Sequence, residues 1–240
     1  MAQKKAEYGS GPLFRAAGVV YGVMMAGVLL VLANMLLVLA PLMVSLAGGS
    51  TLLAAGVVAA ALVPVGPSLV AAAYAFNRLL AGEETGVFRD FLRGYRSNVR
   101  QALAVWLPYL AVMAVVVLNL LLLPGTFDAG NPGLAAARAG LLVLGLLVAT
   151  AGVTAMLLVA RFAFRVRDIH RLSLYCLGAQ KRVSLGNAGI LFISAFLLTA
   201  TTAGLLIFIA GPVMFLICLN SRPLLTFIEA KFTLREPALT

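Results

Sequence analysis

Residues 139–160 read AGLLVLGLLVATAGVTAMLLVA, an apolar run without a single charged side chain. A helix of this length just crosses the hydrocarbon core of a bilayer, which is about 30 Å thick. The whole chain has the same character, since 62% of its 240 residues are hydrophobic and only 11% are charged. A soluble protein of this size could not bury so much apolar surface. The sequence therefore predicts an all-α, polytopic helical membrane protein that forms a single membrane domain over residues 1–240.

Other apolar runs flank this one on both sides. The predicted spans lie at about residues 16–46, 51–80, 102–123, 139–160, 184–202 and 204–227. The last two come from one region, Gly189 to Leu219, which is long for one crossing and short for two. Hydropathy alone therefore leaves five and six spans open. Six is preferred because it returns the basic C-terminal tail to the side of the N-terminus.

The charges are distributed unevenly between the two sides of the predicted bundle. The chain carries 18 Lys and Arg against 8 Asp and Glu, a net charge of +10. Basic residues gather in residues 1–15, 78–100 and 161–182, whereas the opposite side has only Arg138. The positive-inside rule then places the N-terminus and both basic connectors in the cytoplasm. Because these basic segments adjoin the bilayer and hold no recognisable nucleic-acid-binding module, nucleic acid is not an expected partner.

Two Gly-Pro pairs interrupt apolar runs at similar places in the two halves of the chain. Proline lacks an amide hydrogen and clashes with the preceding turn, so breaks are predicted at Gly66-Pro67 and Gly211-Pro212. Broken helices in corresponding positions are one pointer to a substrate site in transporters. In that interpretation Asn34 and Asn119 would line a polar cavity beside the breaks. The alternative is that the prolines only kink the spans for packing.

The segment ahead of the third span is amphipathic. Phe88, Phe91, Leu92, Tyr95 and Val99 recur at helical spacing, and four arginines form a second stripe beside them. One interpretation is a helix at the membrane surface, with its arginines among lipid phosphates. The other is a connector helix packed under the bundle. The candidate contacts for lipid or a partner are Phe88, Arg89, Phe91, Arg93, Tyr95, Arg96 and Arg100.

The residue patterns of the common enzymes are missing from the sequence. The span cores hold no ionisable group, and neither HExxH, GxSxG, a Walker A sequence nor a facing pair of carboxylates occurs. The two cysteines, Cys176 and Cys218, do not have metal-ligand spacing. His170 lies beside Arg171 and is interpreted as an interfacial residue. No catalytic, cofactor-binding or metal-binding residue is therefore predicted, and the chain is expected not to be an enzyme.

The middle of the chain resembles a known family. The run Gly66 to Tyr74, followed by Gly82-Glu83, Phe88-Arg89-Asp90-Phe91, Asn98 and Gln101, is similar to the YesL-like bacterial membrane proteins. The similarity is most specific over Gly66 to Trp106. It implies a location in the bacterial cytoplasmic membrane. No catalytic residue is established for the family, so none is carried over.

The resemblance also sets the functional expectations. YesL-like proteins are a domain of unknown function, often associated with carbohydrate-uptake ABC transporters. The chain is accordingly expected to be an accessory or partner subunit of such a system. Its expected partners are permease or ATPase subunits or a second copy of itself, together with anionic lipid of the inner leaflet. Two alternatives stay open: a small carrier or channel for a neutral solute, and a membrane scaffold that binds anionic lipid.

Overall fold

The computed structural model describes residues 12–46, 51–83, 86–123, 132–200 and 206–233. Helices make up almost all of this part of the chain, and it holds no strand. In order they are α1 (Pro12–Ala33), α2 (Met35–Leu46), α3 (Thr51–Leu62), α4 (Val65–Ala81), α5 (Val87–Leu122), α6 (Pro132–Arg161), α7 (Val166–Ala179), α8 (Lys181–Ala200), α9 (Leu206–Ile228) and the π-helix η3 (Glu229–Thr233). The all-α prediction is confirmed.

Five segments within the described residues are long and apolar enough to cross a membrane. They are Ala16–Ala33, Leu53–Ala81, Val87–Leu122, Pro132–Arg161 and Ile209–Lys231. The chain is therefore a multi-pass membrane protein by length and composition. The region that left five or six spans open contains two helices, α8 and α9, and six crossings remain a prediction.

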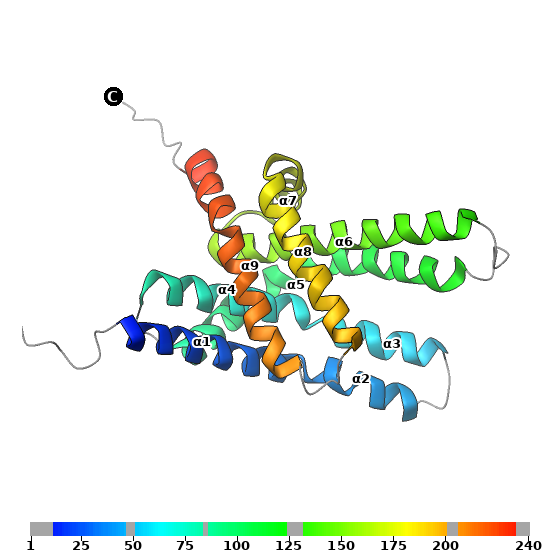
Figure 1. Cartoon of the computed structure of the whole chain (residues 1–240), viewed down its shortest axis with the longest axis horizontal. Coiled ribbons are helices and arrows are strands. Elements are labelled where there is room, and N and C mark those ends of the chain that lie inside the picture. The colour runs from blue at the N-terminus through cyan, green and yellow to red at the C-terminus, as the bar shows by residue number, and fades with distance from the viewer. Residues whose placement is uncertain (1–11, 47–50, 84–85, 124–131, 201–205, 234–240) are drawn as a thin grey trace, which may run out of the picture.

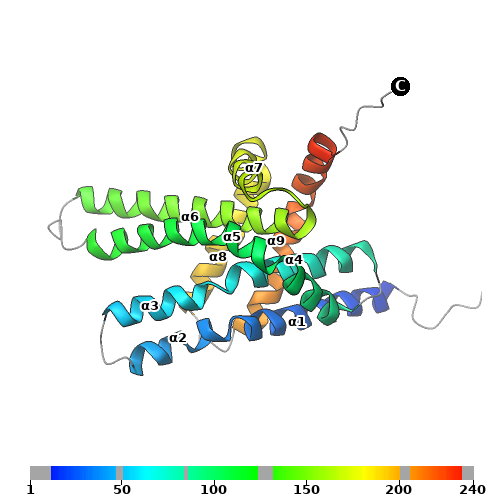
Figure 2. The same ribbon diagram turned by 180° about the vertical axis from the view of Figure 1, so that it is seen from behind.

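The helices form two groups that differ in direction. The pair α1–α2, the pair α3–α4, α5 and α6 run roughly side by side, and α8 and α9 cross them steeply (Figures 1 and 2). Helix α4 lies at the centre, where Val70 and Phe76 are fully buried. Four alanines between and beside them, Ala71, Ala72, Ala73 and Ala75, are equally buried. Small side chains at these positions let neighbouring helices approach closely, which is how helices associate in lipid.

The first predicted span, 16–46, is divided at Asn34. Helix α1 ends at Ala33 and α2 begins at Met35. The side-chain amide of Asn34 donates to the Leu30 carbonyl at 2.8 Å and to the Ser68 hydroxyl oxygen at 2.7 Å. These bonds join the α1–α2 junction to α4.

The break in the second span lies at Val63 and Pro64. The predicted position, Gly66-Pro67, is wrong. Pro67 stands in the first turn of α4, where backbone N–H groups have no partner within the helix in any case. Gly66 serves a different purpose: a Cβ atom there would overlap the ring of Trp106. Gly66 therefore marks a close approach of α4 and α5 and not the break itself.

The predicted break at Gly211-Pro212 is also wrong. Helix α9 continues from Leu206 to Ile228 with Pro212 and Pro223 inside it. A Cβ atom at Gly211 would overlap the carbonyl oxygen of Val23 and come within 3.0 Å of Gly27. Gly211 is therefore the point at which α9 crosses α1.

The amphipathic segment and the third span form one continuous helix. Helix α5 has 36 residues, which corresponds to about 54 Å, so it exceeds the hydrocarbon core by some 24 Å. The basic turns and the span therefore belong to one helix, but Pro108 lies inside it, and a proline within a helix favours a kink. Both interpretations of the amphipathic turns, at the membrane surface and under the bundle, stay open.

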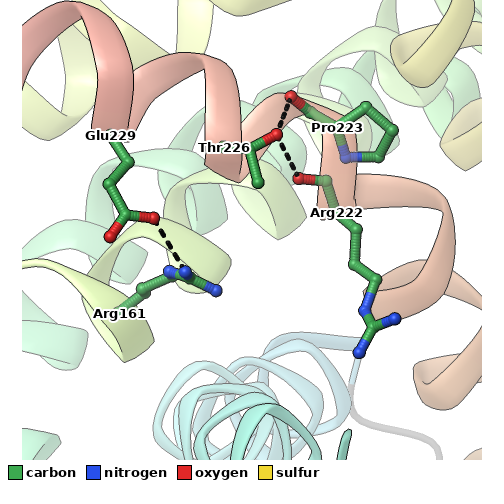
Figure 3. Close-up of polar contacts among 5 residues, drawn as sticks. All are labelled: Arg161, Arg222, Pro223, Thr226 and Glu229. Carbon is green, nitrogen blue, oxygen red and sulfur yellow. Dashed lines mark hydrogen bonds and ion pairs between the residues drawn. The ribbon is translucent and has the colours of Figure 1, made fainter. Parts of the chain in front are cut away.

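One end of the bundle collects most of the charged contacts. The Arg222 guanidinium donates to the Leu80 carbonyl at 3.2 Å, which joins α9 to the end of α4. Arg161, at the end of α6, pairs with Glu229 at 2.8 Å (Figure 3). Just before Glu229, the Thr226 hydroxyl donates to the carbonyls of Arg222 and Pro223 and stabilises α9 around its second proline (Figure 3). We call this end the basic end.

Replacing Gly211 with alanine is expected to lower the thermal unfolding midpoint of the purified protein. The added methyl group would overlap the Val23 carbonyl oxygen and push α9 away from α1, and overpacking of this kind costs about 1–3 kcal/mol. Gly56→Ala is the matched control, because nothing lies within 4 Å of the added atom and alanine favours helix. Equal midpoints for the two variants would contradict the close crossing of α1 and α9.

Candidate functional site

The turn between α4 and α5 is organised by one arginine. Arg78 pairs with Glu83 at 2.5 Å and, through Nε, with Asp90 at 3.2 Å. Gly82 ends α4 in the left-handed conformation, with φ of 78°, which glycine adopts without strain. The Gly82-Glu83 pair and the Asp90 that follows it in the sequence thus fix the angle at which α5 leaves α4. Asp90 is almost fully buried, so its charge depends on Arg78 for compensation.

Four arginines occupy one outward side of α5. Arg89, Arg93, Arg96 and Arg100 are all exposed, and at 100° per residue they fall within an arc of about 60°. Phe88 and Leu92 flank them and are 54% and 37% exposed. None of these arginines forms an ion pair with the described part of the chain. We call Phe88, Arg89, Leu92, Arg93, Arg96 and Arg100 the arginine face.

Two predicted contact residues lie on the other side of the helix. Phe91 is buried, and Tyr95 is half-buried and stacks on it with ring centroids 6.5 Å apart. Beside them, a Cβ atom at Gly94 would come within 2.9 Å of Tyr74 on α4. Phe91 and Tyr95 therefore belong to the contact between α4 and α5 and are not available to a partner or to lipid.

Helix α7 rests on the flank of α5. The Gln101 side chain donates to the Phe164 carbonyl at 2.6 Å, and the Tyr109 hydroxyl lies 2.6 Å from the Ser173 hydroxyl. The ring of His170 packs against Tyr109 with centroids 5.2 Å apart. Burial lowers the pKa of His170, which favours the neutral imidazole. His170 therefore contributes packing here, as expected of an interfacial residue.

A cavity of about 410 Å³ lies where the two broken helices meet the rest of the bundle. Among the described helices, each of α1 to α6, α8 and α9 contributes to its wall, and α7 and η3 do not. Asn34, Ser68, Trp106, Tyr109 and Ser194 are its polar lining residues, and aliphatic side chains and Met113 and Met214 form most of the remainder. Its volume is within the range of small-molecule sites in proteins.

The polar groups of the lining side chains are bonded to protein, except Asn34 Oδ1, which is buried without a hydrogen-bond partner. The Trp106 indole N–H donates to the Leu62 carbonyl at 3.0 Å, so the carbonyl freed by the α3–α4 break is satisfied. Ser68 donates to the Val65 carbonyl, and Ser194 donates to the Ile190 carbonyl. With Asn34 and Tyr109 bonded as described above, the wall that remains is almost entirely carbon.

The predicted cavity residues are only partly brought together. Asn34 and Ala210 line the cavity, whereas Asn119 is exposed on α5 and donates to its own Val115 carbonyl. Of the two Gly-Pro pairs, Gly66-Pro67 and Gly211-Pro212, neither lines the cavity. Asn119 and both pairs therefore drop out of the candidate site.

Sequence reasoning missed a second polar cluster. The Asn220 side chain donates to the Val183 carbonyl at 2.9 Å and to Asn187 Oδ1 at 2.8 Å, and Asn187 donates to the Ser221 hydroxyl. These bonds hold the start of α8 against the end of α9. The signal in the sequence is the glycine that precedes Asn187. The structure shows its purpose, since any side chain at Gly186 would collide with Asn220.

The thiols and carboxylates of the described helices do not form a metal-binding cluster. Cys176 is buried in α7, and burial raises its pKa to about 11, so the thiol is protonated at neutral pH and unreactive. No group of three or more His, Cys, Asp or Glu within the described residues is arranged to hold a metal ion.

The substitution Asp90→Asn is expected to lower the stability of the folded protein by about 1–3 kcal/mol, because it removes the buried carboxylate of the ion pair with Arg78. The contacts of Arg78 with Glu83 and Tyr74 are retained. Loss of the fluorescence or circular dichroism signal on heating measures the change. Asp168→Asn is the control, since Asp168 is exposed and no ion pair of it is found among the described residues. If the Asp90 variant were as stable as the control, the Arg78–Asp90 ion pair would not be what fixes the turn between α4 and α5.

Comparison with known proteins assigns a family to one part of the chain. Residues 28–120 match the model of a family described as protein of unknown function, DUF624. The match includes α4, the turn between α4 and α5, and the arginine face. It confirms the YesL-like resemblance over this part. No curated protein and no solved structure matches the chain.

Proposed function

We propose that this membrane protein, whose residues 28–120 match a family of unknown function, is a non-enzymatic subunit that docks an acidic partner protein through the arginine face. The observation that carries the proposal is the orientation of Arg89, Arg93 and Arg96. They are exposed on one side of α5, and exposed Phe88 and Leu92 lie beside them. Arginine and aromatic residues are enriched in protein interfaces.

The length of the arginine face favours a protein over lipid as the main contact. Eleven residues separate Arg89 from Arg100, a distance of about 16 Å along α5. The headgroup layer on each side of a bilayer is only about 5–8 Å thick. Because Arg89 and Arg93 lie in the first two turns of α5, farther from the apolar span than Arg96 and Arg100, we place them beyond the lipid phosphates. A protein surface that bears carboxylates could contact the whole face.

The chain itself supplies little acidic surface for self-association. It has 8 Asp and Glu residues in all, and Glu83, Asp90 and Glu229 already form ion pairs. This shortage favours a different protein as the partner. The family resemblance suggests the permease or ATPase subunits of a carbohydrate-type ABC uptake system, in which this chain would be an accessory subunit.

The placement in the cell follows from the same charges. The ion pairs and cations of α4, α5, α6 and α9 gather at the basic end, and Arg138 lies at the start of α6. The positive-inside rule supports a bacterial cytoplasmic membrane with the basic end and the N-terminus in the cytoplasm. The arginine face would then meet partners from the cytoplasmic side.

Purification of the tagged full chain in mild detergent is expected to recover permease or ATPase subunits. Changing Arg89, Arg93 and Arg96 together to glutamine should reduce the recovered amount about tenfold or more, because charge complementarity at the interface is lost. The matched control changes Arg165, Arg167 and Arg171 of the α7 region to glutamine, which removes the same charge near the same end. Recovery should be retained in that control.

Two outcomes would contradict the docking proposal. One is isolation of the wild-type chain as a lone protomer. The other is equal recovery of the subunits with both triple variants. If instead the Arg89, Arg93 and Arg96 variant loses only its retention on nanodiscs of anionic lipid, the arginine face serves a membrane scaffold.

A carrier for a small neutral solute is the second candidate, since both broken helices meet at the central cavity. Proteoliposome flux is expected to fall with Asn34→Leu, which alters the cavity wall, and to persist with Asn119→Leu, which lies outside it. Both asparagines bond to a carbonyl four residues earlier, so the pair is well matched. Flux equal to that of empty liposomes would remove this candidate. A sugar is a poor cargo, because its hydroxyl groups would find few partners in the wall.

A further inference from the structure

The central cavity has the properties of a hydrocarbon site. Its wall residues Leu30, Leu62, Trp106, Val148 and Ile209 all belong to segments long enough to span the membrane. Apart from the single carbonyl oxygen Asn34 Oδ1, the polar groups of the lining side chains are bonded to protein, as described above. A ligand with several hydroxyl groups or a charge would therefore lose its hydration without replacement.

A void of this size would be unfavourable if it stayed empty. The atoms of its wall would lack dispersion contacts on one side, and a cavity lined by apolar side chains stays dry instead of filling with water. Such cavities take up apolar molecules. In a membrane the most abundant apolar molecules are the acyl chains of the lipids themselves.

We propose that the cavity binds an acyl chain of a membrane phospholipid, inserted between the broken helices and the α8–α9 pair. Leu37 and Val38 of α2 and Leu191 and Ser194 of α8 line the cavity and are partly exposed, so the wall is open on the bilayer side. The acyl chain enters from the hydrocarbon core of the bilayer, so none of its own atoms loses hydration on binding. This site is independent of the arginine face, so each proposal can fail without the other.

Trp106 provides a reporter inside the site. It is the only tryptophan of the 240 residues, and its ring lines the cavity. Its indole N–H is fixed on the Leu62 carbonyl, and Gly66 leaves room for the ring. A quencher that acts at contact distance will therefore report directly on what touches the cavity wall.

The experiment uses the full chain in vesicles of a neutral phospholipid whose acyl chains carry bromine, compared with the same lipid without bromine. The brominated chains are expected to quench Trp106 fluorescence in the wild-type protein. Ala149→Leu and Val148→Phe place larger side chains in the cavity, and each should lose most of the quenching. Ala139→Leu on the same helix is the control, because Ala139 is exposed and is not part of the wall.

The outcomes separate the possible occupants. We call Ala149→Leu and Val148→Phe the filled variants. Loss of quenching in a filled variant, with quenching retained in Ala139→Leu, supports the acyl chain. The thermal midpoint of that filled variant should equal or exceed the midpoint of the wild type. Equal quenching in wild type and both filled variants would overturn the proposal, because the signal would then come from lipid around the bundle. An unquenched wild type would overturn it too. Quenching by a small brominated hydrocarbon but not by brominated lipid would assign the cavity to another apolar ligand.

Discussion

A backbone interrupted within a bilayer must have its freed carbonyls bonded by protein, because lipid supplies no hydrogen-bond donor. At the α3–α4 junction a side chain meets that requirement, because the Trp106 indole N–H donates to the Leu62 carbonyl. At the α1–α2 junction the backbone N–H of Asn34 donates to the Leu30 carbonyl, and the Asn34 side-chain amide adds a second bond to the same oxygen. The Asn34–Ser68 bond joins this junction to α4, and the Trp106–Leu62 bond joins α5 to α3. The cavity lies beside the two junctions because two helices change direction there and cannot pack as continuous rods.

The bonds that permit the breaks also determine the chemistry of the cavity. Of the two asparagines expected to line a polar cavity, only Asn34 does so, and its amide N–H groups bond the Leu30 carbonyl and the Ser68 hydroxyl, while Oδ1 is left without a partner. Ser68 and Trp106, also in the wall, donate to carbonyls of the protein. The polar side chains therefore stabilise the bundle, and the space between them is left to hydrocarbon.

The basic end depends on a different constraint, the compensation of a buried charge. Asp90 faces the interior of the α4–α5 hairpin and is neutralised by Arg78, which fixes the direction of α5. With Phe91 and Gly94 turned toward α4, the four arginines, which lie about 140–180° around the helix from Phe91, point outward. Burial of one side of the helix and exposure of the arginine face are thus two consequences of the same rotation of α5 about its axis.

The sequence by itself determined the class of the molecule: apolar runs of span length predict helices in lipid, and the clustered basic residues predict one charged end. It also identified the amphipathic stripes, since helical periodicity is a local property. Only the tertiary structure decided which glycine marks a break and which marks a close approach, because the answer depends on whether Trp106 or the Val23 carbonyl lies opposite. It likewise separated Asn34 from Asn119, two asparagines in apolar runs whose different roles come from the helices packed around them.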